Sequence, residues 1–139
     1  MSYLVDTNVL SELRKGRRCD PHVSRWFSSI PEEGVFLSVL VVGEIRRGIE
    51  RIRRRDTRAA RALDAWLRRL LHGHRDRILA IDEAVAEEWG RLNVPDPIPV
   101  VDGLMAATAR VHGLTLATRN VKDVARTGVS FVNPFEAAV

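Results

Sequence analysis

The sequence predicts an α/β fold in which a largely parallel sheet carries helices on both faces. Short apolar segments alternate along the chain with longer segments whose apolar residues recur at helical spacing. This alternation is typical of parallel sheets, because each parallel strand needs a crossover connection to the next. Strands are expected over 3–5, 35–37, 78–81, 114–118 and 129–132. With 139 residues the chain can bury a core of its own, and we expect a single domain over 1–139.

Two helices are predicted between the first two strands. Thr7 or Asn8 can cap a first helix that begins at Val9, because a short polar side chain accepts hydrogen bonds from the free N–H groups of a helix start. The pair Asp20-Pro21 predicts the start of a second helix, since Asp is a preferred cap and Pro fits the first helical position.

The stretch between the second and third strands predicts two long helices joined by a basic turn. Ser38 can cap the first helix, which continues to Ile52. A basic turn around 53–57 leads into the second helix, whose apolar face extends from Ala59 to Leu71. From Arg46 to Arg77 there are 12 arginines and four acidic residues, a balance of +8, whereas the rest of the chain has 10 basic and 14 acidic side chains. The asymmetry indicates either an anionic partner for this segment or arginines that only solvate helix faces.

The remaining helices are predicted after the third strand. Asp82 can cap a short helix, and the proline-rich residues 93–99 are expected to form a loop. A longer helix is predicted over 100–112, where Gly113 follows and can end it. A short helix through Lys122 follows the fourth strand.

Composition argues against a membrane protein and against a disulfide-linked secreted domain. Cys19 is the only cysteine, so no internal disulfide can form. No apolar run approaches the roughly 18 residues needed to span a bilayer. The first strand begins close to the first residue, which leaves no room for a signal peptide. We therefore expect a cytoplasmic protein that does not contact a membrane.

Three acidic side chains stand where ligands bind in folds of this class, just beyond the carboxyl ends of the strands. Asp6 directly follows the first strand, and Asp102 opens the helix that leads to the fourth. Glu44 lies among the apolar residues of its helix, so it must be paired, protonated or bound to a cation. Simpler interpretations stay open, in which Asp6 forms a turn and Asp102 caps a helix. Glu44 can likewise pair with Arg46 or Arg47.

Carboxylates gathered at one edge of a sheet repel each other unless a divalent cation is present. Ligand sets made only of oxygen suit Mg²⁺ or Mn²⁺. We find no candidate Ser–His–Asp or Cys–His set, no phosphate-binding P-loop and no zinc-type cysteine spacing. The chemistry that these residues favour is hydrolysis of a phosphodiester by metal-activated water.

Four pieces of the sequence, in this order, resemble a PIN-domain ribonuclease: LVDTNVLSEL, LSVLVVGEIRRGIERI, VVDGLMAATARVHGLTLATRN and the terminal NPF. The similarity covers nearly the whole chain and points to the VapC-type toxins of toxin–antitoxin pairs. It implies a PIN-like three-layer α/β/α fold with a five-stranded parallel sheet and Mg²⁺-dependent RNA cleavage, with Mn²⁺ as a possible substitute. It also implies neutralisation by a VapB-type antitoxin protein, and we expect a homodimer.

The same resemblance assigns residues to the site. Asp6, Glu44 and Asp102 match the first three acidic positions of the family and would act as catalytic residues and metal ligands. The fourth position follows the threonine–arginine pair and is often Asp, but here it is Asn120. Either Asp123, the nearest carboxylate, takes this role or Asn120 holds a metal-bound water.

Two other classes of function stay open from the residues alone. A receiver-like phosphotransfer domain also gathers acidic residues at strand ends and uses a late lysine, for which Lys122 is available. That class needs an Asp after the third strand, where this chain has only Asp82 in the position of a helix cap. A non-catalytic nucleic-acid-binding module would use the arginine-rich helices, and it leaves Glu44 unexplained.

Overall fold

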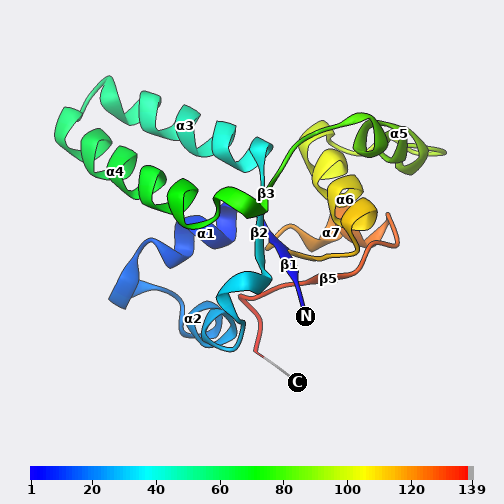
Figure 1. Ribbon diagram of the computed structural model, residues 1–139, viewed down its shortest axis with the longest axis horizontal. Helices are drawn as coiled ribbons and strands as arrows, with labels where there is room; N and C mark the ends of the chain where they lie inside the picture. Colours follow the sequence, from blue (N-terminus) through cyan, green and yellow to red (C-terminus); the bar gives the residue numbers. More distant parts are fainter. Residues whose placement is uncertain (138–139) are drawn as a thin grey trace.

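The centre of the computed structural model, which describes residues 1–137, is a parallel five-stranded sheet (Figure 1). The strands are β1 (Tyr3–Val5), β2 (Val35–Ser38), β3 (Ile78–Leu79), β4 (Thr115–Ala117) and β5 (Phe131–Val132). Their order is β3-β2-β1-β4-β5, and every neighbouring pair is parallel. The predicted fold class and the five strands are therefore confirmed.

The strands at the two edges are shorter than predicted. β3 ends at Leu79 rather than Ile81, because its partner β2 ends at Ser38. The Ser38 hydroxyl oxygen accepts a hydrogen bond from the Leu40 N–H at 3.0 Å and so caps the next helix, as predicted. An edge strand has a neighbour on one side only, so its pairing stops where that neighbour turns away.

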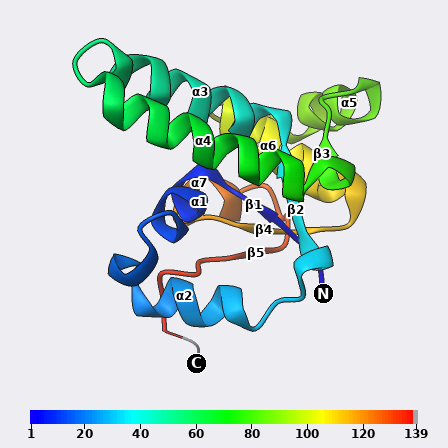
Figure 2. The same ribbon diagram turned by 60° about the vertical axis from the view of Figure 1, so that its left-hand side comes forward.

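Helices cover both faces of the sheet. They are α1 (Thr7–Leu13), α2 (Pro21–Ser28), α3 (Val39–Arg53), α4 (Thr57–Gly73), α5 (Glu83–Leu92), α6 (Val100–His112) and α7 (Val121–Ala125), with short 3-10 turns η1 (Gly16–Arg18), η2 (Glu32–Gly34) and η3 (Arg75–Arg77). Helices α1 to α4 lie on one face and α5 to α7 on the other (Figures 1 and 2). Helices α3 and α4 form a hairpin that extends beyond the sheet. No helix within residues 1–137 is long and apolar enough to cross a bilayer.

The order in which strands are added to the sheet reverses at β1, although all the strands stay parallel. From β1 the chain adds β2 and then β3 on one side, and it returns through α5 and α6 to pair β4 with the other side of β1. Right-handed crossovers put helices on opposite faces when the direction changes, which explains the two helical layers. Such a reversal leaves a crevice at the carboxyl ends of the two central strands, where ligands bind in open α/β sheets.

The first helix starts earlier than predicted. It begins at Thr7, and Asp6 rather than Thr7 or Asn8 occupies the cap position. Asp6 has extended backbone angles, φ −76° and ψ 160°, and its carboxylate accepts a hydrogen bond from the Thr7 N–H. The strand-to-helix turn therefore occurs at the acidic residue itself. This turn directs the Asp6 carboxylate to the carboxyl edge of the sheet.

Candidate active site

A pocket of about 420 Å³ opens at the carboxyl edge of the sheet, beside the point where the strand order reverses. Its lining residues are Asp6, Thr7, Asn8, Glu44, Val101, Asp102 and Asn120. The fold thus brings together four of the five side chains predicted for the site, from β1, α3, α6 and the β4–α7 connection. Asp123, the fifth, is not among the lining residues.

The Asp6 carboxylate is buried, with 9% of the residue exposed, and its hydrogen-bond donors are neutral groups. The Thr118 hydroxyl donates to its Oδ2 at 2.7 Å, and the Thr7 N–H donates to its Oδ1 at 2.8 Å. The Asn8 amide makes a longer contact of 3.4 Å with Oδ2. Thr118 follows β4, so its hydrogen bond to Asp6 connects the carboxyl ends of β4 and β1, the two strands at which the strand order reverses. These donors fix the carboxylate in place, and in the part of the chain that the structure describes it forms no ion pair.

Glu44 lies half-buried on α3 and accepts a hydrogen bond of 2.6 Å from the Thr7 hydroxyl. Arg46 was a possible partner for this carboxylate, but its guanidinium contacts Glu50 and Asp64 instead. Within residues 1–137, Glu44 takes part in no ion pair. The pairing interpretation is therefore wrong for this side chain, and a bound cation remains as a reason for its position.

Asp102 lies in the first turn of α6 and is not its cap, because Pro99 occupies that position. A carboxylate in the first turn is stabilised by the positive end of the helix dipole. The Asn120 side-chain N–H donates to Asp102 Oδ2 at 2.9 Å, and the Asn120 backbone N–H donates to the Thr118 hydroxyl at 3.0 Å. Thr118 and Asn120 therefore connect Asp102 to Asp6 through a chain of hydrogen bonds.

The pKa of Asp102 is raised above the ordinary value, first because the carboxyl is partly buried and then because of neighbouring negative charges. Those charges belong, in decreasing order of effect, to Asp6, Asp123 and Glu44, whereas the hydrogen bond from Asn120 lowers the pKa. A raised carboxyl pKa caused by other carboxylates is typical of a site that binds a cation.

Asp123 stands outside this pocket. It lies in α7, where its carboxylate is 3.9 Å from the Arg126 guanidinium. The negative charge of Asp123 contributes to the raised pKa of Asp102, although the Asp123 side chain does not line the pocket. The assignment of the fourth acidic position to Asp123 or Asn120 stays a prediction, with Asn120 in direct contact with Asp102.

The residues fit a divalent metal by the chemistry of their donors. Across residues 1–137 no three histidine, cysteine, aspartate or glutamate side chains are in position to hold one metal ion directly. The pocket nonetheless offers only oxygen ligands, from carboxylates that repel each other. Mg²⁺ binds such sites through one or two carboxylates and retains several of its waters, so it does not need a complete protein cage.

Thr118 contacts the candidate site but was not predicted from the sequence, and Thr7 was predicted only as a helix cap. Both hold a carboxylate of the pocket through a hydroxyl group. The signal for Thr7 was its position next to Asp6, and for Thr118 its position at the end of the strand predicted to lie beside the site. Neither signal is specific without the tertiary structure, because the Thr118 contact needs β1 to pair with β4 and the Thr7 contact needs α1 to pack against α3.

The fold and the pocket define a class of α/β protein that holds uncompensated carboxylates where a parallel sheet reverses its strand order. Residues 3–128 match the model of the PIN domain family, and the chain belongs to this family. The match confirms the family predicted from the sequence motifs.

Relatives of known sequence extend this finding over nearly the whole chain. The chain is similar to toxin FitB of Neisseria gonorrhoeae, with 32% identity covering 95% of this chain and 97% of FitB. It is also 31% identical to VapC ribonuclease Y4jK of Sinorhizobium fredii, covering 97% of this chain and 99% of that protein. Plasmid stability protein StbB of Pseudomonas syringae is 29% identical over 96% of this chain and 99% of its own.

Solved structures match the fold closely. FitAB bound to the IR36 DNA fragment superposes with a TM-score of 0.89, at 29% identity over 99% of this chain and 98% of that one. FitAcB from Neisseria gonorrhoeae superposes with a TM-score of 0.88, at 32% identity over 96% of this chain and 98% of that one. The arrangement of the sheet and its helical layers is therefore that of known toxin–antitoxin structures.

Proposed function

We propose that this protein is the toxin endoribonuclease of a toxin–antitoxin pair and hydrolyses RNA phosphodiester bonds with the help of Mg²⁺. The observation that carries the proposal is that the carboxylates of Asp6, Glu44 and Asp102 line one pocket of a PIN domain and form no ion pair within residues 1–137. Its similarity to proteins named FitB toxin and VapC ribonuclease supports the same activity.

In this proposal the carboxylates of Asp6, Glu44 and Asp102 surround Mg²⁺, for which Mn²⁺ can substitute. One or two of them would bind the ion directly, and the ion would keep several of its waters. The bound ion would supply an activated water and would neutralise charge that develops on the phosphate. Thr7 and Thr118 keep the Glu44 and Asp6 carboxylates oriented through their hydroxyl groups. Removing a residue that hydrogen-bonds to a metal ligand typically lowers metal affinity or activity by about 10- to 100-fold. We therefore include both threonines in the proposed site.

The partners follow from the relatives. The chain resembles toxin FitB and a VapC ribonuclease along its length, and the solved structures of FitAB and VapBC-1 share its fold. We therefore propose a VapB-type antitoxin protein as the neutralising partner, a homodimeric toxin, and action in the cytoplasm. The single cysteine, Cys19, is consistent with a reducing compartment.

The decisive experiment compares RNA cleavage by the purified protein in Mg²⁺ with cleavage in EDTA, alongside an Asp6→Asn variant. We expect cleavage only by the unmodified protein with metal. RNA binding without any cleavage would favour the non-catalytic module and overturn the proposal. The receiver-like alternative lacks its phosphate acceptor, because Asp82 accepts the Val85 N–H at 3.0 Å as the cap of α5.

A further inference from the structure

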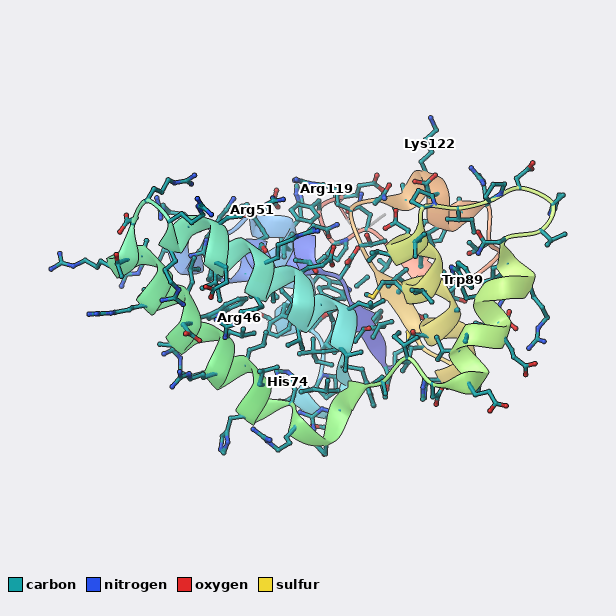
Figure 3. The ribbon with its side chains drawn as sticks, turned by 90° about the horizontal axis from the view of Figure 1, so that it is seen from above. Arg46, Arg51, His74, Trp89, Arg119 and Lys122 are labelled. Atoms are coloured by element: carbon teal, nitrogen blue, oxygen red, sulfur yellow. The ribbon has the colours of Figure 1, made fainter. Side chains whose placement is uncertain are left out.

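Exposed cations lie along one edge of the molecule, on either side of the acidic pocket. Seen from above in Figure 3, Arg51 of α3, Arg119 of the β4–α7 connection and Lys122 of α7 follow one another along this edge. All three side chains are exposed, and within residues 1–137 none of them forms an ion pair with a carboxylate. We call Arg51, Arg119 and Lys122 the basic edge.

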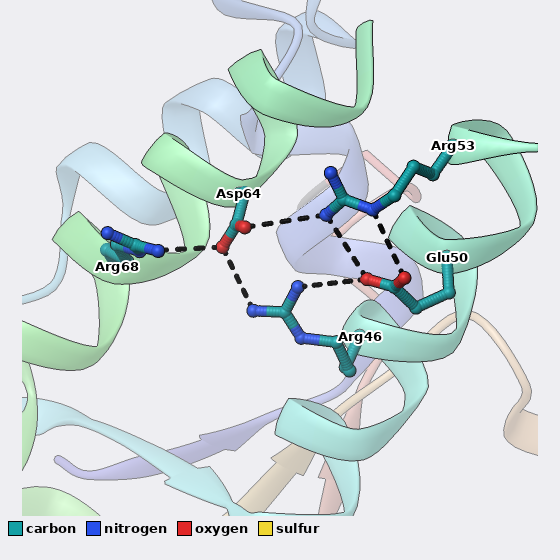
Figure 4. Close-up of polar contacts among 5 residues, drawn as sticks. All are labelled: Arg46, Glu50, Arg53, Asp64 and Arg68. Atoms are coloured by element: carbon teal, nitrogen blue, oxygen red, sulfur yellow. Dashed lines mark hydrogen bonds and ion pairs between the residues drawn. The ribbon is translucent and has the colours of Figure 1, made fainter. Parts of the chain in front are cut away.

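The arginines on the other side of α3 are used within the protein. Figure 4 shows Arg46, Arg53 and Arg68 joined to Glu50 and Asp64 across the α3–α4 hairpin. The shortest of these contacts is 2.9 Å, between Arg46 Nη2 and Asp64 Oδ1. Figure 3 shows Arg46 between α3 and α4, whereas Arg51 points away from α4. The basic segment thus divides into arginines that hold the hairpin together and arginines that are available to a partner.

Arg51 shares a helix face with the acidic site. It follows Glu44 by seven residues on the continuous helix α3, which is close to two turns, so both side chains lie on nearly the same face. Seven residues of helix span roughly 10 Å, about three times the ~3.4 Å axial rise per nucleotide of a stacked strand. A strand that is cleaved beside Glu44 and continues along α3 would therefore reach Arg51 a few nucleotides away.

Arg119 is held beside the pocket from the opposite direction. It precedes Asn120, which lines the pocket, and its backbone N–H donates to the Asn8 side-chain oxygen at 3.2 Å. Its guanidinium lies 3.8 Å from the centre of the Phe135 ring, a cation–π contact that keeps the charge near the rim. This contact leaves the guanidinium donors free to bind an anion.

We propose that the basic edge binds the backbone phosphates of single-stranded RNA on both sides of the bond that lies in the acidic pocket. The inference rests on the proposed function and names the surface that its substrate uses. The pocket carboxylates repel an approaching polyanion, and exposed cations on both sides offset that repulsion and steer the strand inward. A protein partner would not require cations on both sides of an acidic pocket.

The test measures binding of a fluorescein-labelled, mixed-sequence single-stranded RNA of 12 nucleotides across a KCl series in EDTA, so that binding is separated from metal-dependent cleavage. The variant carries Arg51→Gln, Arg119→Gln and Lys122→Gln together. A matched control carries Arg25→Gln, Arg69→Gln and Arg75→Gln, which remove the same charge from exposed arginines of α2, α4 and η3. Circular dichroism checks that both proteins are folded.

We expect the slope of log affinity against log salt to fall by about 2 in the basic-edge variant, because each lost phosphate contact removes about 0.7 for a single strand. The control should keep the slope of the unmodified protein. An equal fall in both variants, or an unchanged slope in the basic-edge variant, overturns the proposal. An unchanged slope together with weaker binding of the antitoxin protein would overturn it and assign the edge to a protein partner. Absent cleavage with a reduced slope would contradict the proposed function and leave the basic edge in place.

Discussion

Two regions of this protein treat carboxylates in opposite ways. In the α3–α4 hairpin, a hydrogen bond from Arg46 lowers the pKa of Asp64, and hydrogen bonds from Arg53 and Arg46 lower the pKa of Glu50. In the pocket, the pKa of Asp102 is raised by burial and by neighbouring carboxylates. Folding therefore favours the ionised form of the two hairpin carboxyls, whereas it disfavours the ionised form of Asp102.

The pKa difference distinguishes acidic residues that stabilise the fold through ion pairs from those whose charge a bound ligand would balance. The hairpin holds its own counterions, so its charges are balanced before anything binds. The pocket uses hydroxyl and amide donors, which orient carboxylates without neutralising them. Such a site lowers the free energy of unfolding of the metal-free protein, and binding of a cation raises it again.

The largest effect that would test this contrast is expected from Asp6→Asn. The amide keeps the shape and the capping ability of Asp6, since Asn is an equally good helix cap, so the fold should persist. RNA cleavage should fall at least ~100-fold, because even the mutation of a residue that only hydrogen-bonds to a metal ligand lowers activity by about 10- to 100-fold. Stabilisation by added Mg²⁺ in a thermal melt should disappear with it. Full cleavage by this variant would remove Asp6 from the site.

A smaller loss is expected from Thr118→Val, which removes the hydroxyl that bridges Asp6 and Asn120. Cleavage should fall about 10- to 100-fold, the range typical of groups that orient a metal ligand. Thr118→Ser retains the hydroxyl and should restore most of the activity. If Thr118→Ser is as impaired as Thr118→Val, the threonine acts through packing and not through its hydrogen bonds.

Asp102→Asn should impair cleavage, as Asp6→Asn does, and its further effect on stability should be small and opposite in sign, because it should stabilise the metal-free protein. Folding raises the Asp102 pKa, so stability falls as pH rises from the ordinary value of 3.8 through the raised value, and the penalty persists above it. The variant should therefore melt at a higher temperature than the unmodified protein at pH 7 in EDTA. The advantage should vanish at a pH below both pKa values. Asp96→Asn, in the exposed loop, serves as the control and should not shift the melting temperature.

The smallest effect is expected from Asp64→Asn in the hairpin. The lowered pKa of Asp64 means that its ionised form adds stability above the ordinary value of 3.8, and this is lost as pH falls through the lowered value. The variant should melt slightly lower at pH 7, because ion pairs near the surface contribute little, and the difference should shrink in high salt. RNA cleavage should stay at the level of the unmodified protein. A loss of cleavage equal to that of Asp6→Asn would contradict the division between the two regions.

Much of the architecture followed from the pattern of the sequence. Alternating apolar segments predicted all five strands, and Gly113 ends α6 in the left-handed conformation, with φ +66°, as expected for a glycine after a helix. Local rules succeeded there because the interactions that form these elements are themselves local. They failed for the first helix, where Asp6 serves as both cap and pocket residue.

The site could be predicted only in part, because its details depend on contacts between distant segments. The motifs named Asp6 and Glu44, but the Thr118 bridge exists only once β1 pairs with β4. Arg46 and Arg51 could not be distinguished before the fold was known, because Arg46 differs through its contact with Asp64 in the next helix. Charge counts identify a basic segment, and the fold decides which of its side chains remain available.

The bond between Thr118 and Asp6 has a consequence for the synthesis of the protein. Domains begin to fold as they leave the ribosome, N-terminal parts first. Asp6 and Glu44 emerge early, but Asp102, Thr118 and Asn120 all belong to the last third of the chain. A nascent chain that displays only Asp6 and Glu44 therefore carries an incomplete pocket. If the pocket cleaves RNA, the translation machinery is exposed to that activity only after the segment that holds Asp102, Thr118 and Asn120 has emerged and β4 has paired with β1.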